Sequence, residues 1–136
     1  MKCIKNTIPI LSFLLILGCS DSKMECENAM CTELFASVQV KVIDSSQTNL
    51  DSITTQTVIP TTGEVLHTQT ELDPINQGFF TIVDDTNLKA IGFNKTQEVE
   101  LRLFKQKKLI KNIPFTIKTD CCHVSKLSGV DQISLN

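Results

Sequence analysis

The chain has 136 residues, which is room for one domain. Its formal net charge is −2, so it lacks the strongly basic surface that nucleic-acid binding requires. It has no Trp and no Tyr, and it therefore lacks the flat amphipathic side chains on which sugars or bases usually stack.

Residues 1–18 are expected to be a secretory signal peptide rather than part of that domain. Lys2 and Lys5 give a positive start, and residues 8–17 form an almost wholly apolar run before Gly18. A basic start, an apolar run and a small residue before the cleavage site are the features of such a signal. The run is too short to span a bilayer comfortably, which takes about 20 apolar residues.

The junction Ile16-Leu17-Gly18-Cys19 resembles the lipobox of bacterial lipoproteins. The resemblance implies that the thiol of Cys19 receives a diacylglyceryl group, that the chain is cut before Cys19, and that the new amino terminus is acylated. Leu17 departs from the small residue that is usual at its position. Each buried CH₂ of a lipid chain contributes about 0.8 kcal/mol, so several chains together anchor firmly. The implied location is the cell envelope, at a membrane surface.

Residues 19–32 are expected to be a lipidated polar tether that contains Cys26 and Cys31. Cleavage before Cys19 leaves 11 of the 13 basic residues and all 15 acidic ones, a net charge of −4. In a Gram-negative cell, an Asp directly after the lipidated Cys resembles an inner-membrane retention signal. This chain has Ser20 at that position. The outer membrane is therefore the expected address in such a cell.

Residues 33–136 are expected to form a β domain, because apolar and polar residues alternate with period two. The alternation is clearest in two segments, with apolar faces formed by Ala36, Val38, Val40 and Val42 and by Val99, Leu101 and Leu103. Other extended segments are predicted at 50–59, 64–70, 79–83, 91–93, 109–118 and 130–135. Seven or eight short strands without a convincing helix predict an all-β fold, a single antiparallel β-sandwich of immunoglobulin or transthyretin type.

Three local features refine this prediction. Phe79 and Phe80 are adjacent on a predicted strand, so one ring is expected to face the core and the other to face outward. The four lysines between 105 and 111 are expected to form a solvated turn rather than a binding patch. Pro114 cannot donate a backbone hydrogen bond, which indicates an edge position or a bulge.

Four cysteines remain once Cys3 leaves with the signal and Cys19 carries lipid, namely Cys26, Cys31, Cys121 and Cys122. Four cysteines in an exported domain predict two disulfides. Adjacent residues of an extended strand point to opposite faces, so Cys121 and Cys122 cannot pair with each other without strain. Each is therefore expected to pair with Cys26 or Cys31, in either of two connectivities.

This pairing also constrains the order of the strands. In a sandwich of this type the first and last strands can be parallel neighbours. The start of the first strand, just after Cys31, is then expected beside the start of the last strand. Because Cys121 and Cys122 precede the turn before that last strand, the predicted disulfides and the predicted strand order agree.

The rival interpretation of the cysteine cluster is a metal site that includes His123. Zinc takes four ligands of this kind, but neither Cys-x₂-Cys nor His-x₃-His spacing is present. His67 is expected to be a surface residue on a weak strand. Asp73, Asp84 and Asp85 lack the spacing of an EF-hand and are expected to cap turns. No catalytic residue, metal or cofactor is predicted, since the sequence has no Gly-x-Ser-x-Gly, His-Glu-x-x-His or phosphate-binding glycine-loop motif.

The segment Asp120-Cys121-Cys122-His123-Val124 resembles the closing segment of a family of small bacterial lipoproteins with a predicted β-sandwich. The resemblance extends to the region of the first two domain cysteines and to the first strand, and it implies no activity. The resulting hypothesis is a non-enzymatic, membrane-anchored binding or structural module. Its expected partners are the membrane and a protein of the envelope. The alternative is a metal-binding or small hydrolytic protein centred on His123 and the cysteines.

Overall fold

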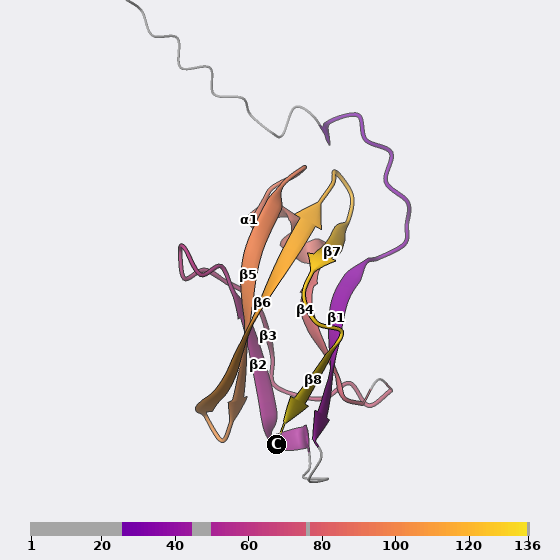
Figure 1. The fold of residues 1–136 in the computed structure, drawn as a ribbon. Helices are drawn as coiled ribbons and strands as arrows, with labels where there is room; N and C mark the ends of the chain where they lie inside the picture. The colour runs from indigo at the N-terminus through magenta and orange to yellow at the C-terminus, as the bar shows by residue number, and fades with distance from the viewer. Residues whose placement is uncertain (1–25, 45–49, 76, 136) are drawn as a thin grey trace, which may run out of the picture.

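Two sheets make up the fold in the computed structural model, which describes residues 26–44, 50–75 and 77–135 (Figure 1). The smaller sheet has the strand order β4 (Phe79–Asp84), β1 (Ser37–Asp44) and β8 (Gln132–Leu135). The larger sheet has the order β3 (Val65–Gln69), β2 (Ile53–Val58), β5 (Thr96–Lys105), β6 (Lys108–Thr119) and β7 (Val124–Ser128). The predicted all-β sandwich is confirmed. The predicted signal peptide and Cys19 lie outside the described residues.

The core lies between the two sheets. Buried and solvent-facing side chains alternate along β1 and β5, as the sequence predicts. The buried positions of these two strands are Val38, Val40, Val42, Val99, Leu101 and Leu103. Successive side chains of a strand point to opposite faces, so each strand contributes every second residue to one shared core. Three further large side chains of these sheets are buried in the same core, namely Phe80, Phe115 and Ile117.

The first and last strands are parallel neighbours, which confirms that prediction, but the contact lies elsewhere along β1. Residues 41–44 at the end of β1 pair with Gln132–Leu135 of β8. The predicted contact between the starts of the two strands is therefore wrong. The cause is β7, a strand that the sequence did not indicate. The loop that carries Cys121 and Cys122 leads into β7, which pairs with β6 rather than with β1.

The chain passes from the larger sheet to the smaller one between β7 and β8. Gly129 lies in this crossing with φ +128°, a conformation that L side chains rarely adopt. A Cβ atom on Gly129 would lie 2.1 Å from Cδ1 of Phe115, whose side chain is buried. Glycine is therefore required here both by the backbone conformation and by the close approach to the core.

The predicted short strand at Ile91 and Phe93 is wrong. A 3₁₀ turn (Asp85–Asn87) runs directly into a one-turn helix, α1 (Leu88–Ile91). Asp84 begins the turn with a capping box: its side chain accepts a hydrogen bond from the N–H of Thr86, and the Asn87 side chain accepts one from the N–H of Asp84. Leu88 and Ile91, three residues apart, bury their side chains on the same side of this turn.

The predictions for the two phenylalanines and for Pro114 are confirmed, and a turn is found within the lysine cluster. The Phe80 side chain is buried, whereas Phe79 is exposed. Gln106 and Lys107 have positive φ in the turn between β5 and β6, and Lys105 and Lys108 flank it. Lys111 lies farther along β6, where its amine donates to the carbonyl of Ser134. Pro114 occupies an edge position on one side of β6, because β7 pairs only with residues 116–119 of that strand.

We predict that Gly129→Ala lowers the free energy of unfolding by about 2–4 kcal/mol, because the new methyl group clashes with Phe115 and positive φ strains an alanine. Gly63→Ala is the matched control. Gly63 has φ +75°, but a Cβ there meets no atom within 4 Å. Strain alone should then cost about 1 kcal/mol at Gly63. Urea denaturation measures both, and equal losses in the two variants would contradict the proposed clash.

Candidate functional site

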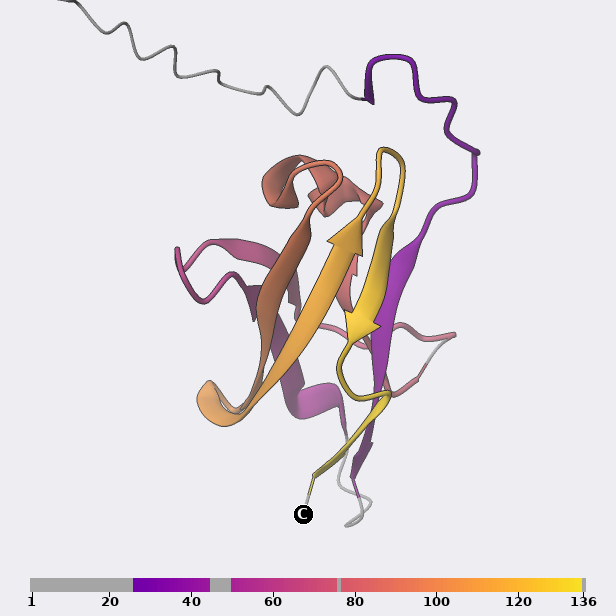
Figure 2. The same cartoon turned by 45° about the horizontal axis from the view of Figure 1, so that its top comes forward.

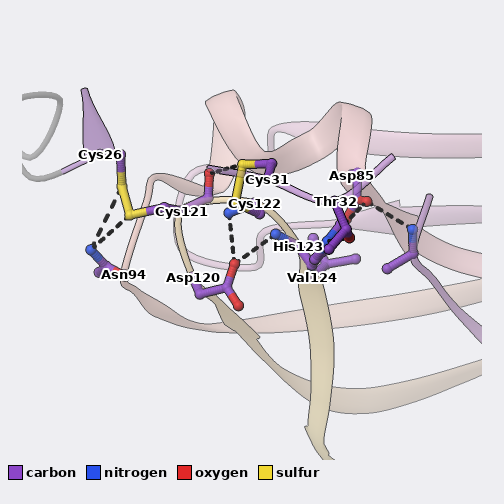
Figure 3. The surroundings of a disulfide bond; sticks show 11 residues. Cys26, Cys31, Thr32, Asp85, Asn94, Asp120, Cys121, Cys122, His123 and Val124 are labelled. Carbon is purple, nitrogen blue, oxygen red and sulfur yellow. Dashed lines mark hydrogen bonds and ion pairs between the residues drawn. A yellow bond between two sulfur atoms is a disulfide. The ribbon is translucent and has the colours of Figure 1, made fainter. Parts of the chain in front are cut away.

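The segment of residues 26–36, here called the strap, precedes β1 and is cross-linked to the loop between β6 and β7. One disulfide joins Cys26 to Cys121 and the other joins Cys31 to Cys122, each with the two Cα atoms 5.3 Å apart (Figure 3). Each cysteine of the strap thus pairs with one member of the adjacent pair, as predicted. Of the two connectivities that the sequence left open, this one keeps the pairs in chain order.

A turn stabilised by Asp120 allows two adjacent cysteines to face the same strap. Oδ1 of Asp120 accepts hydrogen bonds from the N–H groups of Cys122 (2.6 Å) and His123 (2.7 Å). The N–H of Asp120 donates to the carbonyl of His123 across the turn, at 3.1 Å. Because the chain turns here instead of continuing as a strand, the opposite-face rule that separates adjacent side chains does not hold.

Asn94, just before β5, also contacts this cross-link. Its side-chain nitrogen donates to Sγ of Cys121 (3.5 Å) and to Sγ of Cys26 (3.7 Å). The loop before β5 is thereby joined to the strap and to the β6–β7 loop. Three segments that are distant in sequence therefore meet at one end of the sandwich.

The Asp85 carboxylate forms a second connection, here called the Asp85 latch. Its Oδ2 accepts from the N–H of Ala36 (2.7 Å) and from Nδ1 of His123 (2.8 Å), and its Oδ1 accepts from the N–H of Val124 (2.9 Å). The N–H of Asp85 donates in return to the carbonyl of Ala36. One side chain at the start of the 3₁₀ turn thus holds the end of the strap and the start of β7.

His123 extends the latch to the middle of the strap. One ring nitrogen of His123, Nδ1, donates to Asp85. The other, Nε2, lies 3.1 Å from Oγ1 of Thr32. Acid, imidazole and hydroxyl are arranged in the order used by nucleophilic enzymes. Here, however, Asp85 also binds two backbone N–H groups, and both ring nitrogens of His123 connect structural elements. We interpret the arrangement as a clamp on the strap.

Hydrogen bonding lowers the pKa of both carboxylates at this end. Burial would raise the pKa of Asp85, but hydrogen bonds from Ala36, His123 and Val124 outweigh that effect and hold the pKa below its usual range. The backbone N–H groups of Cys122 and His123 lower the pKa of Asp120 in the same way. Both groups are therefore more stable as carboxylates in the folded state than in the unfolded chain.

The other candidate ligands of the sequence have local roles. Asp73 accepts from the N–H of Ile75 (2.8 Å) and Asp84 accepts from Thr86, so the interpretation as turn caps is confirmed for these two acids. It is wrong for Asp85, because the fold brings distant N–H groups and His123 to its carboxylate. His67 lies in β3 opposite Thr57 of β2. Among the described residues, no three His, Cys, Asp or Glu side chains are grouped as metal ligands. The zinc alternative would need free thiolates where the structure has two disulfides.

Sequence reasoning identified the four cysteines and His123 but missed how Thr32 and Asn94 contribute and what Asp85 binds. The capping pattern from Asp84 to Asn87 marks the turn in which Asp85 lies. No local pattern connects Asp85 with a histidine 38 positions later.

No protein-family model, curated protein or solved structure matches the chain. In the described part of the chain, no helix is long and apolar enough to cross a membrane.

We predict that the two disulfides stabilise the fold in a strongly non-additive way. They close loops of similar length, with sequence separations of 95 and 91. While one remains, removing the other opens only a ring of about eight residues and costs about 2.5 kcal/mol in the chain-entropy model. Removing both also releases the long loop, for a total of about 7 kcal/mol.

The measurement is denaturant unfolding of three Cys→Ala variants without reductant. Two variants lack one pair each (Cys26 with Cys121, or Cys31 with Cys122), and the third lacks all four cysteines. The loss in the third variant should exceed the sum of the losses in the first two. A simple sum, or a single removal that costs as much as the double one, would contradict the shared-loop explanation.

We predict that stability falls as the pH drops through the lowered pKa values of Asp85 and Asp120. A carboxylate with a depressed folded-state pKa stabilises the fold above the unfolded-state pKa of about 3.9, and this contribution is lost as the carboxylate is protonated at lower pH.

Asp85→Asn and Asp120→Asn should each be less stable than the parent at neutral pH and should lose less stability on acidification. Glu33→Gln, at an exposed position in the strap, is the control and should retain the parental pH profile. Unfolding midpoints across this pH range test the prediction, and parental profiles in both Asn variants would contradict it.

Proposed function

We propose that the chain is a lipoprotein of the bacterial cell envelope, acylated at Cys19, that acts as a non-enzymatic binding or structural module. The lipobox-like junction after an apolar run supports the anchor. Two disulfides support an oxidising compartment outside the cytoplasm, because cytosolic thiols are normally kept reduced. In a Gram-negative cell the proposed location is the outer membrane.

The observation that carries the proposal is the position of the first cross-link relative to the acylation site. Cys26 lies seven residues after Cys19 and is bonded to Cys121 in the β6–β7 loop. Seven extended residues span at most about 25 Å. A lipid on Cys19 would therefore hold the sandwich close to the membrane, and the disulfides would transmit that anchoring directly to the folded domain.

The non-enzymatic part of the proposal is supported by what the polar side chains at this end already bind. Asp85 binds His123 and the backbone N–H groups of Ala36 in the strap and Val124 in β7. His123 in turn lies within hydrogen-bond distance of the Thr32 hydroxyl. A hydrolytic role for His123 would require Thr32 to leave this clamp or to react within it. We therefore propose a module that presents a surface rather than one that converts a substrate.

We predict that Cys19→Ala abolishes incorporation of labelled palmitate and leaves the precursor uncleaved, because the thiol is the acceptor of the first lipid. Cys3→Ala is the matched control, since Cys3 lies within the predicted signal peptide and its replacement should leave labelling intact. Metabolic labelling of cells that express each full-length chain, followed by mass measurement of the product, tests both. Equal labelling of the Cys19→Ala variant and the parent would refute lipidation at this residue.

A further inference from the structure

The strap exposes large apolar side chains. Met30 is 97% exposed, Leu34 78% and Phe35 65%. Single exposed apolar residues are normal on a protein surface, but several close together indicate a docking surface. These three fall within six consecutive residues of a segment that is fixed by two disulfides and the Asp85 latch. The fold therefore holds them in water without burying them.

The strap lies at the end of the sandwich that also carries the β6–β7 loop and α1 (Figures 1 and 2). The C-terminal β8 ends at the opposite end, near the turn between β5 and β6 (Figures 1 and 2). The chain that leads to Cys19 joins the domain at Cys26, the first residue of the strap. Any lipid on Cys19 thus approaches the domain from the strap end.

We propose that the strap is a membrane-docking surface, in which Met30, Leu34 and Phe35 insert into the lipid interface beside the anchor. This inference rests on the proposed function, because it needs the lipid on Cys19 to bring the strap to the bilayer. A tether of seven residues keeps the local lipid concentration high, so contacts too weak to bind alone become effective.

The charge of the strap determines which lipid surface fits. It contains Glu27 and Glu33 and no basic residue. Anionic lipids would repel these carboxylates, so the docking is apolar and suits a zwitterionic surface. The disulfides favour docking in a second way, because the strap is already ordered and little further conformational entropy is lost when it inserts.

The chain has no Trp, so one introduced Trp is a unique reporter of depth. The experiment uses the mature protein with Phe35→Trp, purified from bacterial cells that express the full-length chain and reconstituted in phosphatidylcholine vesicles with brominated acyl chains. We expect the introduced indole to lose most of its fluorescence and its emission to shift to the blue. Leu34→Trp provides a second reporter, should Phe35→Trp impair folding. Leu109→Trp is the matched control: Leu109 is also exposed, but it follows the turn at the far end, and an indole there should remain unquenched.

Vesicle flotation separates failure of the docking from failure of the anchor. Protein that floats with the vesicles while the indoles of the Phe35→Trp and Leu34→Trp variants remain unquenched would overturn the docking alone. Protein that does not float would overturn the proposed function. A blue shift without quenching would place the strap against another protein or a second copy, and it would also overturn docking to lipid. Quenching that appears only with added phosphatidylglycerol, or that is lost at high salt, would overturn the apolar mode.

Discussion

The double cross-link between the strap and the β6–β7 loop is the constraint on which the N-terminal end of this domain depends. The strap has several large exposed side chains, so burial of apolar surface does not hold it in place. The Cys26–Cys121 and Cys31–Cys122 disulfides hold it instead, and the Asp85 latch sets the point at which β1 begins. Covalent bonds and partly buried hydrogen bonds here perform the role that a hydrophobic core performs elsewhere in the sandwich.

The C-terminal part of the fold, from β7 to β8, depends on backbone geometry. Beyond the cross-linked loop, β7 extends the larger sheet, the chain crosses at Gly129, and β8 completes the smaller sheet beside β1. The N–H of Lys41 donates to the carbonyl of Asp131 at this crossing, so β1 is connected to the C-terminal segment before β8 begins. The last segment of the chain thus contacts both sheets and closes one side of the sandwich.

The proposed lipid anchor would act on a strap that is fixed rather than free. If Cys19 carries lipid, the path from the membrane to the core runs through a short tether and then through two disulfides. The sandwich is then held with one end toward the bilayer and the other end, with the β5–β6 turn and the C-terminus, directed away. The surface available to an envelope partner would be the faces of the sheets and that distal end.

The sequence by itself determined the features that depend on local pattern. The alternation in β1 and β5 and the opposite exposure of Phe79 and Phe80 follow from side chains pointing to opposite faces of a strand. The same rule predicted that Cys121 and Cys122 bond to the strap rather than to each other; the bonding is confirmed, but the two cysteines lie in a turn, where the rule does not apply. The proposed lipidation of Cys19 also rests on local pattern alone, and Cys19 lies outside the described residues.

Only the tertiary structure decided which cysteine pairs with which, that residues 124–128 form a strand, and that Asp85 binds His123. In β7 just one side chain, Val124, is buried, so the strand has no period-two pattern and exists because its backbone pairs with β6. The Asp85 latch joins segments that are 38 and 49 positions apart. Hydrogen bonds between distant segments leave no periodic trace in the sequence, since they depend on where the fold brings the chain together.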